Sequence, residues 1–291
     1  MNDIDQKLLN AINVQGILLQ EKCSKIFSDK GWSVATEYPV IYPKPAFGGL
    51  GKECVIDLWG KKQIAEIELN FFVECKKANP KLKNWIFFVD QFNQSTGTDV
   101  IKLWEMSEGK WKTETSLQDF REGIKTALNL KSENTSFWGL ETKENFTKAP
   151  QGNDTITSTD RIINAAYQAT QATNGSFGEY GEYLAKLGES SLTKEPKTVL
   201  LIPMIVTTAN LLEAEYDPKN IDENGEILDV KNISFKEKEI IFYSYPVPGH
   251  IRFSMVEENI PKMSLESRLG YKRTLVMVVN IKFLPKLLDI K

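Results

Sequence analysis

Asp57, Glu74 and Lys76 are the residues of this chain whose types and spacing are best suited to chemistry. Glu74 and Lys76 belong to the run FFVECK at 71–76, and Asp57 lies earlier, in the apolar run VIDLW at 55–59. An acid among β-favouring apolar residues needs an ion or a polar partner, because burying an unpaired charge is costly. Two carboxylates with room for water suit Mg²⁺, and a neighbouring lysine can act on water or on phosphate. The pattern therefore predicts a magnesium site for phosphate chemistry.

The run around Glu74 and Lys76 has the period of a β-strand. Alternate side chains of a strand point to opposite faces, so Glu74 and Lys76 share one face. The other face receives the apolar side chains of Phe71, Val73 and Cys75. In an antiparallel hairpin with the run at 55–59, the midpoint falls at Ala65 and Glu66, which places Asp57 beside Glu74. No Asn-Gly or Asp-Gly turn lies between the runs, so this register is an inference.

The flanking segments supply a helix and further strands around this pair. An amphipathic stretch from Leu8 to Phe27 precedes it, followed by GWSV at 31–34, and the run WIFFV at 85–89 comes after it. In this context Asp57, Glu74 and Lys76 resemble the signature of the PD-(D/E)XK, or restriction-endonuclease-like, nuclease superfamily: an acid on one strand and an acid-x-Lys triplet on the next. The resemblance covers residues 1–90 and implies Asp57 and Glu74 as metal ligands, with Lys76 as the third catalytic residue. It implies Mg²⁺ as the cofactor and Mn²⁺ as a substitute.

The first helix departs from this resemblance, because many members of the superfamily carry a further metal-binding Glu there. The side chains expected to form the buried stripe are Leu8, Ile12, Leu19, Cys23, Ile26 and Phe27. Glu21 projects opposite this stripe, at about 100° per residue, whereas Gln20 lies near its edge. Gln20 also has the better spacing to Gly31. Gln20 and Glu21 are thus the two candidate contributors from the helix.

The composition favours a soluble globular protein. Hydrophobic residues make up 41% and charged residues 26% of the 291 positions, which allows a large core. The longest apolar run, at 199–206, is too short for a bilayer, and the first residues lack a signal-peptide pattern. We therefore expect a cytoplasmic protein without a membrane partner. Cys23, Cys54 and Cys75 lack the spacing of a disulfide framework or a zinc site, so they are expected in the core.

The net charge of −3 argues against a protein that coats nucleic acid non-specifically. Lysines are nevertheless concentrated near the proposed site, at 61–62, 76–77, 81 and 83. Trp85, Phe87 and Phe88 could stack on bases, but their continuous apolar run favours core packing. We expect DNA as the partner, with RNA left open, and a homodimer is compatible with the sequence.

Three other motifs do not support a site. The loop at 46–53 resembles a phosphate-binding loop, but Glu53 replaces the Ser or Thr that would hold Mg²⁺. His250 is the only histidine, which excludes mechanisms and metal sites that need two. The acidic segment 217–225 lacks the ligand spacing of a calcium loop, so it is expected to be a turn.

The remaining chain contains further helices and strands. We expect an amphipathic helix at 116–130, a long polar loop at 131–158, and a helix at 159–172. Arg161 and Gln168 on that last helix are candidates for contacts with the substrate backbone, as is Lys77, although a solvated helix face is the simpler interpretation of the first two. Strands are expected at 198–210, 238–245 and 274–280, and a short helix at 283–288.

These elements predict an α/β fold with a central mixed sheet flanked by helices. Residues 1–190 would form the restriction-endonuclease-like core, with a polar insertion at about 91–158, and residues 196–291 a C-terminal strand-rich α/β extension that could belong to the same domain. By resemblance, the expected activity is Mg²⁺-dependent phosphodiester hydrolysis by a DNA endonuclease in restriction, repair or defence. The alternative is an inactive nucleic-acid-binding or assembly protein in which Asp57 and Lys76 form a buried ion pair.

Overall fold

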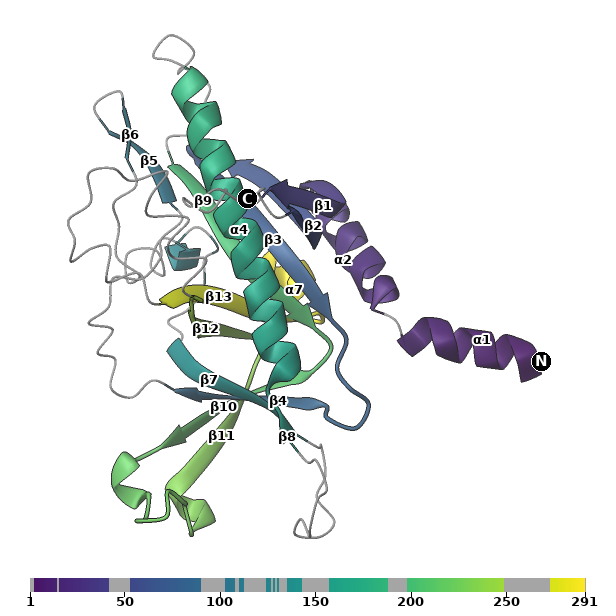
Figure 1. Cartoon of the computed structure of the whole chain (residues 1–291), viewed down its shortest axis with the longest axis vertical. Helices are drawn as coiled ribbons and strands as arrows, with labels where there is room; N and C mark the ends of the chain where they lie inside the picture. Colours follow the sequence, from purple (N-terminus) through teal and green to yellow (C-terminus); the bar gives the residue numbers. More distant parts are fainter. Residues whose placement is uncertain are drawn as a thin grey trace.

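The computed structural model describes residues 3–14, 16–41, 53–89, 103–107, 110–112, 124–126, 128, 130, 135–142, 157–187, 198–248 and 273–290. In these ranges a large mixed sheet with few helices forms an α/β fold, as predicted (Figure 1). His250 and most of the loop at 46–53 lie outside the described residues. The helix expected at 116–130 is described only in part, and its residues 124–126 are helical.

Thirteen strands of the described ranges belong to one sheet, whose main path is β1-β2-β3-β9-β13-β12-β7-β4-β10-β11. The first half comprises β1 (Ser33–Ile41), β2 (Glu53–Ile64), β3 (Ile67–Lys76), β9 (Thr198–Thr207) and β13 (Arg273–Asn280). The second half comprises β12 (Ile240–Pro246), β7 (Thr135–Thr142), β4 (Asn84–Val89), β10 (Asn210–Tyr216) and β11 (Ile233–Lys238). Three short strands lie off this path: β5 (Leu103–Ser107), β6 (Lys110–Lys112) and β8 (Thr157–Ser158).

Groups of strands from the first and the last parts of the chain follow one another across this sheet. β9 pairs in parallel with β3 on one side and with β13 on the other, and β10 pairs in parallel with β4. The strands after position 196 therefore continue the sheet that begins with β1, β2 and β3. All three strands predicted there are present, whereas β10 and the edge strand β11 were not predicted.

Helices lie on both faces of the sheet (Figure 1). Helix α4 (Asp160–Leu187) crosses one face over β9, β3 and β2, and α2 (Ile17–Asp29) and the short α7 (Leu284–Leu287) lie on the other. The core between the sheet and α2 and α7 contains the expected apolar face of β3, including Phe71, Val73 and Cys75. A second core beneath α4 contains Trp85 and Phe87, both fully buried as predicted.

The N-terminal segment forms two helices instead of one amphipathic stretch. α1 (Asp3–Val14) ends before Gly16 and extends away from the sheet (Figure 1). The prediction that Leu8 and Ile12 are buried is wrong: they are 58% and 48% exposed, because α1 has left the sheet that buries the stripe on α2. The stripe residues Leu19, Cys23 and Phe27 are buried as expected.

Of the loop predictions for the segments 131–158 and 217–225, the first is wrong and the second is confirmed. The prediction of a long polar loop at 131–158 is wrong, because β7 lies inside it and pairs with both β4 and β12. Pairing on both edges of the strand overrides its polar composition. The acidic segment at 217–225 is a turn, as expected; it contains the 3₁₀ helix η2 (Pro218–Asn220), and η3 (Val230–Asn232) follows it. Asp222 there accepts hydrogen bonds from the backbone N–H groups of Asn224 and Glu226.

No helix among the described residues is both long and apolar enough to cross a membrane.

Candidate active site

The hairpin of β2 and β3 places Asp57 opposite Glu74. Its turn consists of Ala65 and Glu66, as predicted, and Ala65 adopts a left-handed backbone with φ of +52°. The last pair of the ladder is Leu58 with Val73, so the next position along each strand is Asp57 on β2 and Glu74 on β3. The two acids therefore meet where the regular pairing of the strands ends.

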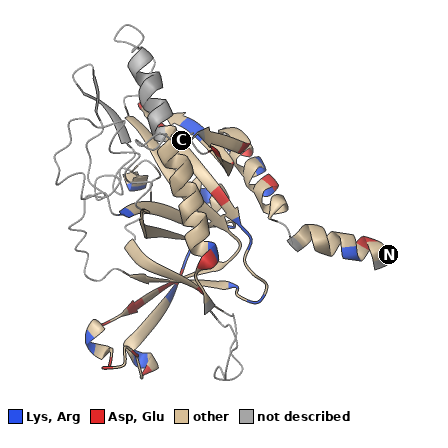
Figure 2. Cartoon of the chain, in the orientation of Figure 1, with Lys and Arg blue, Asp and Glu red and all other residues tan. Residues whose placement is uncertain are grey.

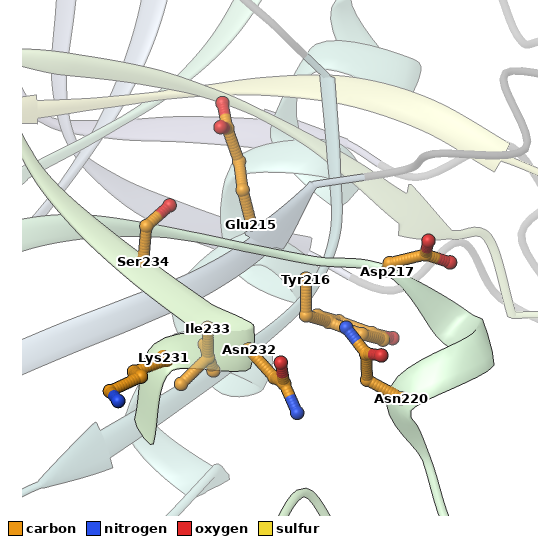
Figure 3. Close-up of a pocket in the computed structure, with 8 residues that line it drawn as sticks. All are labelled: Glu215, Tyr216, Asp217, Asn220, Lys231, Asn232, Ile233 and Ser234. Atoms are coloured by element: carbon orange, nitrogen blue, oxygen red, sulfur yellow. The ribbon is translucent and has the colours of Figure 1, made fainter. Parts of the chain in front are cut away.

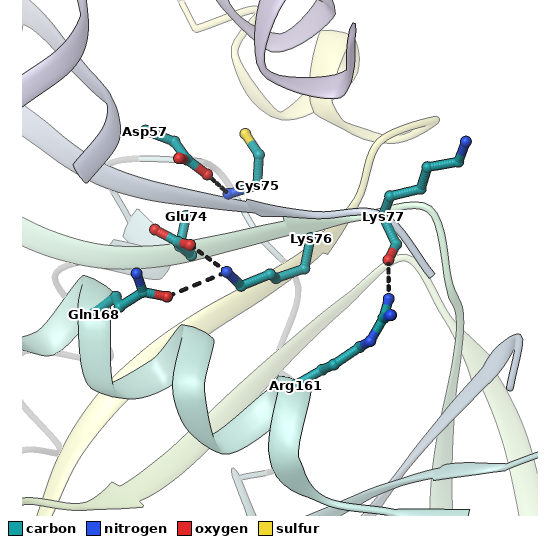
Figure 4. A network of polar contacts seen from close by, with 7 residues as sticks. All are labelled: Asp57, Glu74, Cys75, Lys76, Lys77, Arg161 and Gln168. Carbon is teal, nitrogen blue, oxygen red and sulfur yellow. Dashed lines mark hydrogen bonds and ion pairs between the residues drawn. The ribbon is translucent and has the colours of Figure 1, made fainter. Parts of the chain in front are cut away.

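Asp57 turns its carboxylate toward the backbone of β3. Its Oδ2 atom accepts a hydrogen bond of 2.7 Å from the N–H of Cys75 (Figure 4). Burial raises the pKa of Asp57, the Cys75 hydrogen bond and the charge of Lys76 lower it, and the charge of Glu37 raises it. The carboxylate is thus fixed in place by β3 and lies within the field of other charges.

Glu74 is the most deeply buried acid of this group, with 2% of its surface exposed. Its Oε1 atom lies 2.5 Å from Lys76 Nζ, whereas Oε2 is buried and has no hydrogen-bond partner in the described part of the chain. In Figure 4 the second oxygen is turned away from Lys76. Burial and the charge of Asp57 raise the pKa of Glu74 to about 7 against the lowering effect of Lys76. Lys76 therefore offsets only part of the cost of ionising Glu74.

Lys76 shares the strand face of Glu74, as predicted, and connects that face to helix α4. Its Nζ donates to Glu74 Oε1 and, at 3.1 Å, to Gln168 Oε1 on α4 (Figure 4). The only charged residues of α4 among its described side chains are in the first turn (Figure 2). Gln168 thus orients the ammonium group of Lys76 without neutralising it.

Arg161 in the first turn of α4 contacts the end of β3. Its guanidinium donates a 2.8 Å hydrogen bond to the carbonyl of Lys77 (Figure 4). The Lys77 side chain points away from Glu74, and its Nζ donates to the carbonyl of Asn13 at the end of α1. The sequence predicts that Arg161 and Gln168 are solvated or contact the substrate. In this structure Arg161 donates to the end of β3, and Gln168 accepts a hydrogen bond from Lys76.

Helix α2 contributes Gln20 to the site, and not Glu21. The Gln20 Nε2 atom donates to Glu37 Oε1 at 2.7 Å and to the carbonyl of Asp57 at 2.8 Å. Glu21 is exposed on the helix. Of the two predicted contributors, only Gln20 is brought to Asp57, and it brings with it the carboxylate of Glu37 on β1.

Glu37 is a site residue that the sequence reasoning missed. The β1–β2 register places it opposite Asp57, between the pairs Thr36–Leu58 and Tyr38–Ile56. The sequence does not reveal that Glu37 lies opposite Asp57, because the length of the loop between β1 and β2 does not determine how the two strands pair. The acid in the polar segment TEY at 36–38 was the available signal.

The donor set can be tested against a divalent cation. Carboxylate oxygens are the ligands that Mg²⁺ prefers, and it is usually held by one or two carboxylates while keeping several waters. Asp57 and Glu74 provide two carboxylates. One of their oxygens, the buried Oε2 of Glu74, has no hydrogen-bond partner among the described residues. Among the described residues, no group of three His, Cys, Asp or Glu side chains is arranged as direct metal ligands. Two carboxylates match the number that Mg²⁺ usually takes from a protein, and a cation at Asp57 and Glu74 stays a prediction.

An open pocket of about 410 Å³ lies elsewhere, beside β10 and β11 (Figure 3). Its acids have local partners: Glu215 forms an ion pair with Lys236, and Asp217 caps η2 by accepting from the backbone N–H of Lys219. Strands β10 and β11 end the sheet path opposite β1 and β2. The pocket is therefore separate from the Asp57–Glu74 pair.

Comparisons of this chain with protein-family models, with curated proteins and with solved structures give no match. The superfamily resemblance seen in the sequence stays a prediction.

Proposed function

We propose that this protein is a metal-dependent nuclease that hydrolyses phosphodiester bonds at Asp57, Glu74 and Lys76. The observation that carries the proposal is the oxygen Oε2 of Glu74, which is buried beside Asp57 without a hydrogen-bond partner in the described residues. Burying such a group is costly unless something compensates it. A divalent cation would compensate two carboxylates that share one lysine.

Asp57 and Glu74 would hold the cation, Mg²⁺ with Mn²⁺ as a substitute. When bound, such an ion supplies a water of lowered pKa and stabilises charge on a phosphoryl oxygen. The chain's own part is to fix both carboxylates, which it does by the Cys75 N–H on Asp57 and by Lys76 on Glu74.

Lys76 would orient the attacking water or hold the phosphate. Its ammonium group is a point charge with three donors, of which two are used by Glu74 and Gln168. The third donor remains for water or for a phosphate oxygen. Gln168 keeps the ammonium in position by accepting one of its hydrogen bonds. Its amide oxygen is uncharged, so it does not compete with phosphate for the positive charge.

DNA is the substrate we favour, and an endonuclease in restriction, repair or defence is the corresponding role. Cationic groups near the end of β3 support a polyanionic substrate: Lys77 and Arg161 lie there, and Lys81 is exposed on the following loop. A homodimer would suit cleavage of both strands of a duplex.

The second candidate is a catalytically inactive nucleic-acid-binding or assembly protein. The ion pair expected for it, between Asp57 and Lys76, is instead formed by Lys76 Nζ with Glu74 Oε1 at 2.5 Å. This contact favours the alternative, since a paired carboxylate needs no further cation. It leaves Glu74 Oε2 unexplained, and for this reason we place it second.

A cleavage assay tests the proposal. Supercoiled plasmid, linear duplex, single-stranded DNA and RNA are incubated with protein in Mg²⁺, in Mn²⁺ and in EDTA. The proposal expects cleavage of at least one polymer with either metal and none in EDTA, and loss of cleavage in Asp57→Ala. Cleavage that persists in EDTA, or an Asp57→Ala variant as active as wild type, would refute the site.

A further inference from the structure

Glu37 has a backbone conformation that its surroundings do not explain. Its φ of +49° lies in the left-handed region, which a residue other than glycine rarely adopts. Such conformations cost energy and are concentrated at functional sites. The Glu37 side chain is exposed, so burial of apolar surface does not stabilise this conformation.

Gln20 holds the Glu37 carboxylate toward the strand that carries Asp57. Gln20 is 8% exposed, and its Nε2 donates both to Glu37 Oε1 and to the Asp57 carbonyl. Both protons of the amide group are therefore used by this arrangement. The same buried amide thus links the Glu37 carboxylate to the backbone of the strand that carries Asp57.

The charges around Glu74 are unbalanced. Glu37, Asp57 and Glu74 face one another from three strands, and Lys76 is the cation that acts on the last two. Glu74 is only 2% exposed. Its buried Oε2 has no hydrogen-bond partner among the described residues and is turned away from Lys76 (Figure 4). A buried oxygen without a partner, next to further negative charge, needs compensation, which a proton or a bound cation can supply.

We propose that Glu37 is a third carboxylate of the cation site at Asp57 and Glu74, and that Gln20 is the residue that positions it. This inference rests on the proposed function, because it requires a divalent cation at that site. The three acids do not converge as direct ligands, so Glu37 acts on the cation by its charge from outside the two direct ligands. One exposed carboxylate acting by its charge through water on a nearby divalent cation changes its affinity by roughly 3–10-fold.

Calorimetric titration with Mn²⁺ tests the role of Glu37. Glu37→Gln removes the charge and keeps an oxygen that Gln20 can bind, and we expect it to weaken Mn²⁺ binding by roughly 3–10-fold. The matched control is Glu21→Gln, which removes the same charge from an exposed position on α2 and should bind Mn²⁺ like wild type. Equal affinities for the two variants would overturn the inference, while Mn²⁺ binding by wild type that is lost in Asp57→Ala would keep the proposed function intact. If wild type itself fails to bind Mn²⁺, both are overturned.

A double-mutant cycle tests the role of Gln20. Gln20→Met keeps the length of the side chain but removes its donors, and it should weaken Mn²⁺ binding in the wild-type background and have no effect in Glu37→Gln. An equal loss in both backgrounds would mean that Gln20 acts through Asp57, which contradicts the positioning role.

Glu37→Gly separates this role from a structural one. Glycine adopts the left-handed backbone without strain, so the melting temperature should stay the same or rise while Mn²⁺ affinity falls. A Glu37→Gly protein that melts earlier would show that the Glu37 side chain serves the fold, and would overturn the inference.

Discussion

At the scale of single residues, the chemistry depends on how Glu74 is compensated. Its carboxylate is buried against α4, shares Lys76 with Asp57 and has one oxygen without a partner in the described chain. The sequence predicted that Asp57, Glu74 and Lys76 would meet, because the period of a strand and the midpoint of the hairpin follow from local geometry. It could not predict Glu37 or the contacts of Gln168, because those depend on the β1–β2 register and on the placement of α4.

The proposed role of Lys76 leads to a test that separates chemistry from metal affinity. Lys76→Ala should reduce the cleavage rate about 10²-fold or more, the range for a positioned acid–base group, while Mn²⁺ still binds. Lys77→Ala is the control, since the Lys77 side chain points away from Glu74 and should keep most activity. Rates and Mn²⁺ calorimetry would be measured on both variants, and an inactive Lys77→Ala beside an active Lys76→Ala would refute the assignment.

The raised pKa of Glu74 predicts how stability depends on pH without metal. Between the ordinary value of 4.5 and its folded pKa of about 7, Glu74 keeps its proton in the folded state but loses it in the unfolded chain. Raising the pH through this window therefore lowers the free energy of unfolding, by at most roughly 3 kcal/mol from this group. The charged groups that act on Glu74 are Asp57 on β2, Lys76 on β3 and Glu37 on β1.

Urea unfolding in EDTA from pH 5 to pH 8 would measure this effect, with Glu74→Gln as the reference. The wild type should lose stability relative to Glu74→Gln as the pH rises. A difference between the two proteins that stays constant over this range would contradict the account of Glu74.

At the scale of elements, the predictions succeeded where local pattern determines structure. The strands β3, β4, β9, β12 and β13 and the start of α4 follow from apolar runs and helical spacing. The failures have tertiary causes: α1 leaves the sheet, so Leu8 and Ile12 are exposed, and β7 becomes a strand because both of its neighbours pair with it. Neither cause is visible in the local sequence.

The packing of α2 on the hairpin predicts an effect of Gly60 on stability. A Cβ atom at Gly60 would lie 2.5 Å from Cε1 of Phe27, a fully buried ring. Gly60→Ala should therefore reduce the free energy of unfolding by about 1–3 kcal/mol, the usual cost of overpacking a core. Chemical denaturation measures it, and the matched control is Gly16→Ala, whose Cβ would lie 3.8 Å from the carbonyl oxygen of Cys75 and whose backbone is right-handed helical. A Gly60→Ala protein as stable as wild type would show that the Phe27 ring moves aside without cost, which contradicts tight packing of α2 on the hairpin.

At the scale of the whole molecule, the sheet joins the two ends of the chain. β3, which carries Glu74 and Lys76, pairs with β9 at every position from Ile67 to Lys76. The sequence suggested a core at 1–190 followed by an extension, because the site residues are all in the first part. The order of strands in a sheet is set by long-range pairing, which a change in composition near 190 does not reveal.

This topology predicts that residues 1–190 do not fold alone. Without β9, strand β3 would expose an edge of unpaired backbone groups next to a large apolar surface. The fragment should lack a cooperative thermal transition in circular dichroism and should aggregate, whereas the full chain unfolds in a cooperative transition. A monomeric fragment with a cooperative transition would refute the requirement for β9.

Titration of the full-length protein with Mn²⁺ by calorimetry tests the central claim, that Asp57 and Glu74 form a divalent-cation site, most directly. The account predicts saturable binding to the wild type, and loss of that binding in Asp57→Ala and in Glu74→Gln, with both variants folded by circular dichroism. Absence of binding to the wild type, or unchanged binding in both folded variants, would contradict it.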